Sequence, residues 1–250
     1  SWVMRTIAEH DETMPIFYGL DGSKSDSVEE RDVPGWNGIG PVTIGNRAGD
    51  QLQLGVWGDV FEIMRQYVRA GNVLDRKTAA VLQELADDAC HRWPEADSGM
   101  WELQEAQHYT TSKIGCWQAL DAAVELHDAG MIDGPRDKWI ENRELIEDWV
   151  AENGWNEELG HYVMYPGTDA LDCSILLHAM SAFDRGPRME STIRAIEEQL
   201  QHGPLVYRYS GIQDEESPFV ACSFWLAAAL ACVGRVDDAK QLMDDMVAQA

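Results

Sequence analysis

PFVACSFWLAAALACV, at residues 218–233, is the longest apolar run of the chain. Its sixteen residues fall short of the roughly 20 that a helix needs to cross a membrane, so the run predicts a helix buried inside a protein. Residues 136–152 (RDKWIENRELIEDWVAE) instead place apolar positions at helical spacing among charges, which predicts an amphipathic helix. Nearly all-apolar helices mixed with amphipathic ones are typical of an inner ring of helices wrapped by an outer ring. The predicted fold class is therefore all-α, with the architecture of an α/α toroid.

Helical periodicity dominates the chain from about residue 48 onward, and strands are hard to find. The clearest case is Met189, Ile193, Ile196 and Leu200, which lie on one face of a helix. No fixed period of about 30 to 45 residues repeats along the chain, so a superhelical repeat protein is the weaker alternative. The predicted helices cover residues 2–9, 48–70, 75–92, 111–129, 136–152, 169–182, 189–200, 218–233 and 236–248.

Two long irregular stretches interrupt the helices, one from Tyr18 to Gly45 and one from Trp93 to Thr110. A third and shorter stretch runs from Val206 to Ser217. Long loops in compact domains usually carry function, because the packed elements around them hold their side chains in place. We therefore expect the functional residues in these three loops.

The chain is strongly acidic, with 44 Asp and Glu against 19 Lys and Arg and a formal net charge of −25. Such a charge disfavours binding to nucleic acid or to an anionic membrane. Only five of the basic residues are lysines, and abundant carboxylates with few lysines are typical of a haloarchaeal cytoplasm, where salt screens the repulsion. An ordinary acidic protein of a mesophile is the alternative.

Cysteine usage bears on the compartment. The five cysteines are odd in number and include no C-x-x-C pair, which predicts buried reduced thiols and a cytoplasmic protein. The chain begins at Ser1 without a methionine, so we expect a piece of a longer protein, and secretion stays open. The sequence makes no prediction of the oligomeric state.

Several classes of chemistry lack their usual motifs. The sequence has no H-E-x-x-H, and its seven histidines are scattered without the spacing of metal ligands. It also has no G-x-S-x-G, Walker or G-x-G-x-x-G motif, so acyl and nucleotide chemistry lose their usual signals. No metal and no cofactor is predicted.

Acidic residues beside aromatic ones are the remaining signal, and the first group is DSGMWE at residues 97–102. Aromatic faces stack on sugar rings, and carboxylates drive the cleavage of glycosidic bonds. An indole beside Glu102 would remove water from its carboxylate and favour the protonated form that a general acid needs. The alternative is that Glu102 is an ordinary solvated surface glutamate.

The second acidic group is DEESP at residues 214–218, directly before the apolar run. Ser217 is a good N-cap and Pro218 a good first residue of a helix, which would place Glu216 beside a helix N-terminus. The partial positive charge there favours an ionised carboxylate, as a general base requires. The alternative is that these acids only complement the helix dipole, and spacing alone does not choose among Asp214, Glu215 and Glu216.

At these residues the sequence resembles glycoside hydrolase family 15, the glucoamylase, glucodextranase and trehalase family, over nearly all 250 residues. The resemblance implies an (α/α)6 toroid, the six-hairpin glycosidase fold, of which residues 1–250 form the C-terminal part. The family's N-terminal β-sandwich and first barrel helices would then lie outside this chain. The motifs that carry the resemblance are FYGLDG (17–22), PVTIGNRAGDQLQLGVWGDV (41–60), DSGMWEL (97–103), SKIGCWQALDAA (112–123), GWNEELGHYV (154–163), DALDCSILL (169–177), LVYRY (205–209) and FVACSFWLAAALA (219–231).

The resemblance implies hydrolysis of α-glucosidic bonds with inversion, with Glu102 as general acid and Glu216 as general base. The two carboxyls of an inverting pair lie roughly 6.5 to 9.5 Å apart, which leaves room for the attacking water. The expected substrates are α-linked glucose oligosaccharides or trehalose, and the choice among the family's activities stays open. Substrate-binding residues implied by the resemblance are Tyr18, Asp21, Met100, Trp101, His108, Lys113 and Arg208.

Alternatives remain for several of these residues and for the chain itself. Each implied binding residue can instead hold a loop in place, and Trp139, Trp149 and Trp225 fall at helical spacing and are expected to be packing residues. The family's W-x-R-D type motif, whose Arg and Asp hold glucose, is not in this chain. The alternative function is therefore a non-catalytic carbohydrate-binding or interaction remnant of such a barrel.

Overall fold

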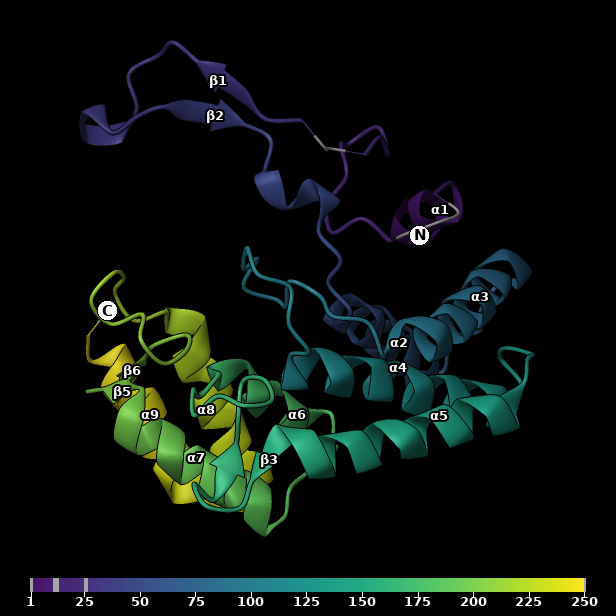
Figure 1. Cartoon of the computed structure of the whole chain (residues 1–250). Coiled ribbons are helices and arrows are strands. Elements are labelled where there is room, and N and C mark those ends of the chain that lie inside the picture. Colours follow the sequence, from purple (N-terminus) through teal and green to yellow (C-terminus); the bar gives the residue numbers. More distant parts are fainter. Residues whose placement is uncertain (1, 11–13, 25–26, 250) are drawn as a thin grey trace.

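The computed structural model describes residues 2–10, 14–24 and 27–249 of the chain. This part of the chain is mostly helical (Figure 1), which confirms the predicted all-α class. Its α-helices are α1 (Trp2–Ala8), α2 (Gly55–Arg69), α3 (Arg76–Arg92), α4 (Thr110–Asp128), α5 (Arg136–Trp149), α6 (Leu177–Met180), α7 (Pro187–Gln199), α8 (Val220–Cys232) and α9 (Val236–Val247).

The strands of the described residues are only two or three residues long and form isolated antiparallel hairpins. Each hairpin lies within a connection between helices, so it shapes a loop and adds no layer to the fold (Figure 1). The pairs are β1 (Glu29–Arg31) with β2 (Val42–Ile44), β3 (Trp155–Asn156) with β4 (His161–Tyr162), and β5 (Gln201–His202) with β6 (Leu205–Val206).

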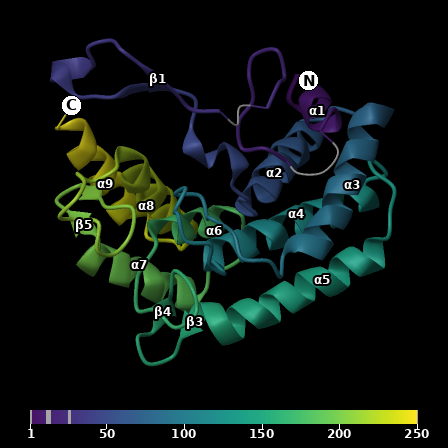
Figure 2. The same cartoon turned by 45° about the horizontal axis from the view of Figure 1, so that its top comes forward.

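Helix α4 is the centre of the core and packs between α2 and α5 (Figures 1 and 2). Fifteen of its 19 residues are buried, including five polar or charged ones in its N-terminal half, because neighbouring elements cover the helix on several sides. It approaches α2 at backbone distance: a Cβ on Gly115 would lie 2.6 Å from the Cα of Gly55. The helix ends at Asp128, and Gly130 two residues later has a φ of +70°, which favours glycine.

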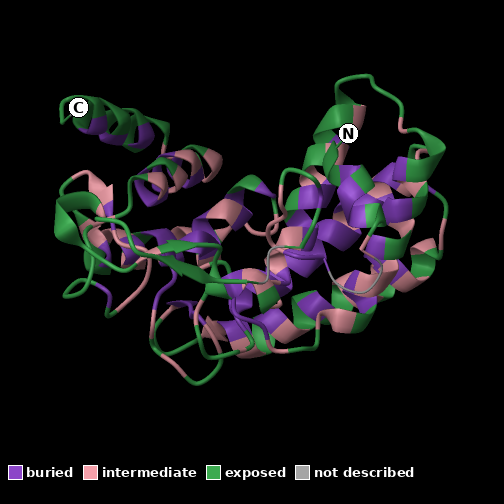
Figure 3. Ribbon diagram, turned by 90° about the horizontal axis from the view of Figure 1, so that it is seen from above, coloured by how far each residue is buried: buried purple, intermediate pink, exposed green. Residues whose placement is uncertain are grey.

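Helix α8 contains the apolar run and is less buried than we expected. It buries residues such as Cys222 and Leu226 against the core, but it leaves one face open (Figure 3). Phe219, Val220 and Phe224 are 46%, 52% and 48% exposed on this side. The prediction that the whole run is buried is therefore wrong for this face of α8.

Two predicted helices differ from the observed ones. Residues 47–50 form a separate 3-10 turn before α2, because the Asn46 side chain accepts a hydrogen bond from the Ala48 amide. The predicted helix at 169–182 is shorter than expected, since only residues 173–180 are helical and the first four of these form a 3-10 turn. Asp172 is extended and forms a β-bridge with Tyr209, and this tertiary pairing overrides the local helical pattern.

The cysteines were predicted to be buried reduced thiols, and the apolar run was predicted to be too short to cross a membrane. Cys90, Cys116, Cys173 and Cys222 are buried free thiols, and Cys232 is half-buried. In the described part of the chain, no helix is both long enough and apolar enough to cross a membrane.

Candidate active site

The loop that carries Glu102 lies between α3 and α4 and is anchored by Asp97. This buried carboxylate accepts hydrogen bonds from the Leu54 amide at 2.9 Å and from the Ser112 hydroxyl at 2.8 Å. Burial raises the pKa of Asp97, while these hydrogen bonds oppose the rise. A β-bridge between Asp97 and Gln107 closes the loop. The hydrogen bonds of Asp97 attach the two ends of the loop to the N-terminal ends of α2 and α4. We call residues 97–107 the acid loop.

Glu102 lies exposed in the acid loop with its backbone in the left-handed region, at φ +58°. Its Oε2 accepts a hydrogen bond of 3.2 Å from Asn46 Nδ2, and Gln51 Nε2 donates to its carbonyl at 3.3 Å. A positive φ in a residue other than glycine is uncommon and often marks a functional position. The neighbouring indole of Trp101 turns to Asp172, so the expected desolvation of Glu102 by that indole is wrong for this structure.

Trp101 lies in an aromatic cluster that joins the acid loop to distant parts of the chain. Its ring centroid lies 5.9 Å from that of Trp225 and 6.2 Å from that of Phe219. The guanidinium carbon of Arg208 lies 5.2 Å from the Trp101 ring centroid, in a cation–π contact. The structure thus brings together two of the predicted binding residues, Trp101 and Arg208. Trp225 packs against the hydrophobic core, as predicted, and also against the Trp101 ring.

Glu216 forms an ion pair with Arg208, whose Nη2 donates to its Oε1. The predicted position of Glu216 beside a helix N-terminus is wrong, because α8 begins at Val220 and no side chain caps it. The Phe219 amide donates to the Val206 carbonyl at 2.9 Å, and Phe219 itself is extended, so the helix begins only at Val220. The favourable charge near Glu216 is therefore the guanidinium of Arg208.

Lys113 and His108 lie just after the acid loop in the chain, Lys113 in the first turn of α4 and His108 before it. The side chain of Lys113 is fully buried, and its ammonium donates to the carbonyls of Trp93, at 2.7 Å, and Glu95. Burial lowers the pKa of Lys113. His108 is exposed, with its ring 6.3 Å from that of Trp149. These contacts favour the loop-holding alternative for Lys113.

Tyr18 and Asp21 lie in the first long loop, near α1. The Tyr18 ring lies 5.5 Å from that of His10 and 6.3 Å from that of Trp2, and burial raises its pKa. The Asp21 carboxylate accepts hydrogen bonds from the amide and hydroxyl of Ser23, which lower its pKa. These contacts favour the loop-holding alternative for both residues.

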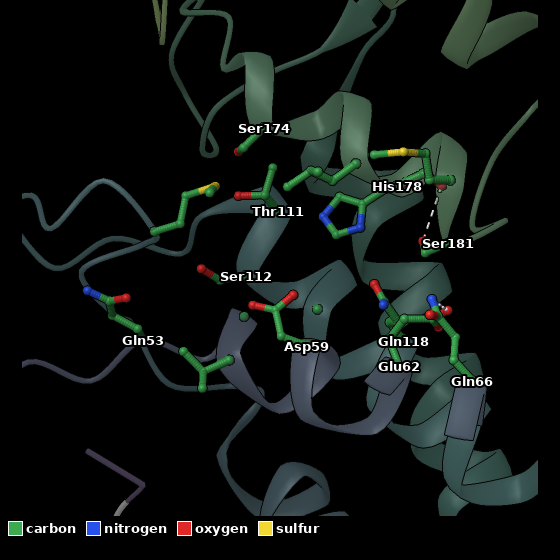
Figure 4. A pocket seen from close by; sticks show the side chains of 16 residues that line it. Gln53, Asp59, Glu62, Gln66, Thr111, Ser112, Gln118, Ser174, His178 and Ser181 are labelled. Carbon is green, nitrogen blue, oxygen red and sulfur yellow. Dashed lines mark hydrogen bonds between the residues drawn. The ribbon is translucent and has the colours of Figure 1, made fainter. Parts of the chain in front are cut away.

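A cavity of about 520 Å³ lies beside the acid loop, between α2, α4 and α6 (Figure 4). Of the predicted site residues, Met100 lines it. Figure 4 shows the carboxylate of Asp59 and the imidazole of His178 pointing into the cavity, with Ser112 and Gln118 from α4 on either side of Asp59. The volume is within the range of small-molecule sites in proteins.

Sequence reasoning missed most of the lining of this cavity. Asp59 and Glu62 lie on one face of α2, and Ser112, Gly115 and Gln118 lie on one face of α4. The sequence did contain a signal for them, because polar residues at helical spacing indicate a helix face that contacts solvent or a polar cavity.

The cavity presents neutral polar groups as well as carboxylates. The imidazole of His178 is buried, and burial lowers its pKa to about 4, so the ring is neutral at pH 7. Its Nδ1 has no hydrogen-bond partner among the described residues. Desolvation raises the pKa of Asp59. A pocket of hydroxyl, amide and imidazole groups beside an aromatic and guanidinium cluster is suited to a polyhydroxylated ligand.

Comparisons with known proteins bear on the family and the fold of this chain. The family model described as glycosyl hydrolases family 15 matches residues 1–249. The trehalase of Mycobacterium tuberculosis is 31% identical over 97% of this chain and 37% of its own length. The trehalase of Mycolicibacterium smegmatis is 32% identical over 95% of this chain and 37% of its own length, and that of Thermoplasma acidophilum is 27% identical over 99% and 44%. The chain thus spans about two fifths of the length of these relatives.

Solved structures show the same fold. A wild-type glycosidase superposes with a TM-score of 0.69 and 18% identity, over 85% of this chain and 59% of that chain. A variant of a glycosidase in complex with glucose gives a TM-score of 0.68 at 18% identity, with the same coverage. These likenesses confirm the predicted toroid architecture.

Proposed function

The chain belongs to glycosyl hydrolases family 15, and we propose that the whole protein hydrolyses the α-glucosidic bond of trehalose with inversion. The choice of trehalose rests on the two mycobacterial trehalases, which are 31% and 32% identical to this chain. The observation that carries the proposal is the acid loop, which presents the exposed carboxylate of Glu102 two residues from Met100 at the cavity. Free thiols and the acidic surface support the cytoplasm as the compartment.

In the proposed reaction, Glu102 is the general acid. It donates its proton to the oxygen that links the two glucose units as the bond between this oxygen and the anomeric carbon breaks. A water molecule attacks the anomeric carbon from the opposite face, and a second carboxylate takes its proton. Asn46 holds one oxygen of Glu102 and leaves the other oxygen to carry the proton.

Glu216 is the proposed general base, as the family resemblance implies. Its ion pair with Arg208 favours a second role, because Oε1 is already engaged by the guanidinium. In that role Glu216 fixes Arg208 above the indole of Trp101, where the guanidinium can donate to sugar hydroxyls. The two roles differ in their response to azide. Azide can replace the activated water and restore turnover of a variant without its base, but it cannot replace a residue that orients Arg208.

The test compares glucose release from trehalose and from maltooligosaccharides by the full-length protein. We expect trehalose to be the better substrate, and the Glu102→Gln variant to lose at least about a thousandfold in kcat because it has no proton to donate. Glu216→Ala with added azide then separates the two roles of Glu216. If the full-length protein releases glucose from neither substrate, the non-catalytic binding remnant becomes the better account.

A further inference from the structure

Asp172 is a buried carboxylate that joins the acid loop to the chain segment of Arg208. It is 3% exposed, and its Oδ1 accepts hydrogen bonds from Trp101 Nε1 at 2.9 Å and from the Ser174 amide at 2.8 Å. Its backbone forms a β-bridge with Tyr209. Burial raises the pKa of Asp172, and the hydrogen bonds from Trp101 and Ser174 oppose this rise.

The segment around Asp172 is fixed to the Arg208 segment on both sides. The Cys173 amide donates to the Arg208 carbonyl at 2.9 Å, and the Ser210 amide donates to the Leu171 carbonyl at 3.0 Å. Asp172 is therefore held in one place by the backbone, and its side chain is free to hold Trp101. A buried carboxylate needs such partners, because they offset the loss of its hydrogen bonds to water.

The indole of Trp101 connects Asp172 to the proposed general acid. Trp101 directly precedes Glu102, whose backbone is in the left-handed region. An indole anchored to Asp172 therefore fixes the stretch of backbone from which the Glu102 side chain projects. Asn46 and Gln51 hold Glu102 from the other side. Arg208 lies over the same indole. One hydrogen bond from the Trp101 indole to Asp172 thus orients two parts of the site.

We propose that Asp172 is a positioning residue for the general acid Glu102 and acts on it through the indole of Trp101. This inference rests on the proposed function. Loss of the Asp172 carboxylate should impair the donation of a proton to the leaving group more than it impairs the other parts of the reaction. A substrate whose leaving group needs no proton reveals this difference.

The test measures kcat for trehalose and for α-glucosyl fluoride in the full-length protein. Fluoride departs with little help from an acid, whereas a sugar alkoxide needs a proton. We expect Asp172→Ala to lower kcat for trehalose by about a hundredfold and for the fluoride by less than about fivefold. Asp172→Asn should keep trehalose turnover within about fivefold, because an amide oxygen can accept both hydrogen bonds.

Two further variants keep the test decisive. Trp101→Phe removes the N–H that donates to Asp172 and keeps a smaller aromatic ring beside Arg208. It should show the same selective loss for trehalose even if Asp172→Ala fails to fold. Asp87→Ala is the matched control: Asp87 accepts from Trp139 Nε1 at 3.0 Å, away from the acid loop, and its loss should leave both substrates unchanged.

The proposal is overturned if Asp172→Ala and Trp101→Phe reduce both substrates equally, or if neither variant slows trehalose. A wild-type protein inactive on both substrates contradicts the proposed function itself, and with it this role. The two failures are therefore distinguishable.

Discussion

Among the side chains of the cavity, His178 links the protonation of a buried group to the stability of the fold. Its ring is buried, and its pKa falls to about 4 because burial disfavours the imidazolium. In the unfolded chain the same group has a pKa near 6.5. Between these two values the unfolded chain binds a proton that the folded protein does not bind, so folding is opposed as the pH falls.

This difference predicts a specific pH dependence of stability. A depressed histidine pKa means that the contribution of His178 is fully present above about pH 6.5 and is lost as the pH falls to about 4. The free energy of unfolding should decrease over this window by about 3 kcal/mol from this residue alone. Urea unfolding at several pH values measures it. In His178→Gln the decrease should be smaller by that amount, and an unchanged pH dependence in this variant would contradict the assignment.

At the residue scale, the sequence predicted the loop positions better than the helix positions. The DSGMWE motif led to the acid loop, and Trp101 and Arg208, far apart in the chain, do meet in the structure. Asp59 and His178 were missed, since residues on helices look like packing residues until the helices are placed. Lys113 was predicted to bind substrate, but the fold shows that its ammonium donates hydrogen bonds to loop carbonyls.

At the scale of elements, the contact of α2 with α4 decides where the cavity lies. The two helices meet through glycines: a Cβ on Gly115 would lie 2.6 Å from the Cα of Gly55, and one on Gly58 would lie 2.7 Å from the Gly115 carbonyl oxygen. Backbone atoms cannot yield as flexible side chains do. Larger residues here would force the helices apart and widen the cavity.

Alanine substitutions test this contact. Gly115→Ala should lower the free energy of unfolding by about 3 kcal/mol, because the added methyl overlaps the α2 backbone. Gly55→Ala is the matched control, since a Cβ at Gly55 meets no atom within 4 Å and should change stability by less than about 1 kcal/mol. Denaturant unfolding compares the two variants, and equal stabilities would refute the close approach of the helices.

The helices themselves were largely predictable. The predicted ranges 75–92, 111–129, 189–200 and 236–248 agree with α3, α4, α7 and α9 within two residues at each end. The errors occur where a tertiary contact competes with local pattern. The β-bridge of Asp172 keeps its segment extended, and the bond from the Phe219 amide to Val206 starts α8 later than Ser217 and Pro218 suggested.

At the scale of the whole molecule, the net charge should make stability depend on salt concentration. The net charge of −25 makes the compact state repel itself at low ionic strength, and added salt screens this repulsion. We therefore predict that the melting temperature rises between about 0.1 M and 2 M KCl. A melting temperature that stays constant over this range would remove the argument for a halophilic protein.

The fold of the whole molecule was predictable because ordered motifs run along nearly all of the chain, and the family match covers residues 1–249. The choice of substrate was not predictable, because the groups that bind the leaving sugar depend on how distant loops meet. The relatives named trehalases supply that choice for the proposal.

The anomers that the full-length protein releases from trehalose test the central claim most directly, when they are followed by proton NMR before mutarotation. An inverting reaction that uses Glu102 as acid releases equal amounts of α- and β-glucose, because one unit is inverted and the other keeps its configuration. Under the same conditions Glu102→Gln should release neither. Release of α-glucose alone, or undiminished turnover by Glu102→Gln, would contradict the account.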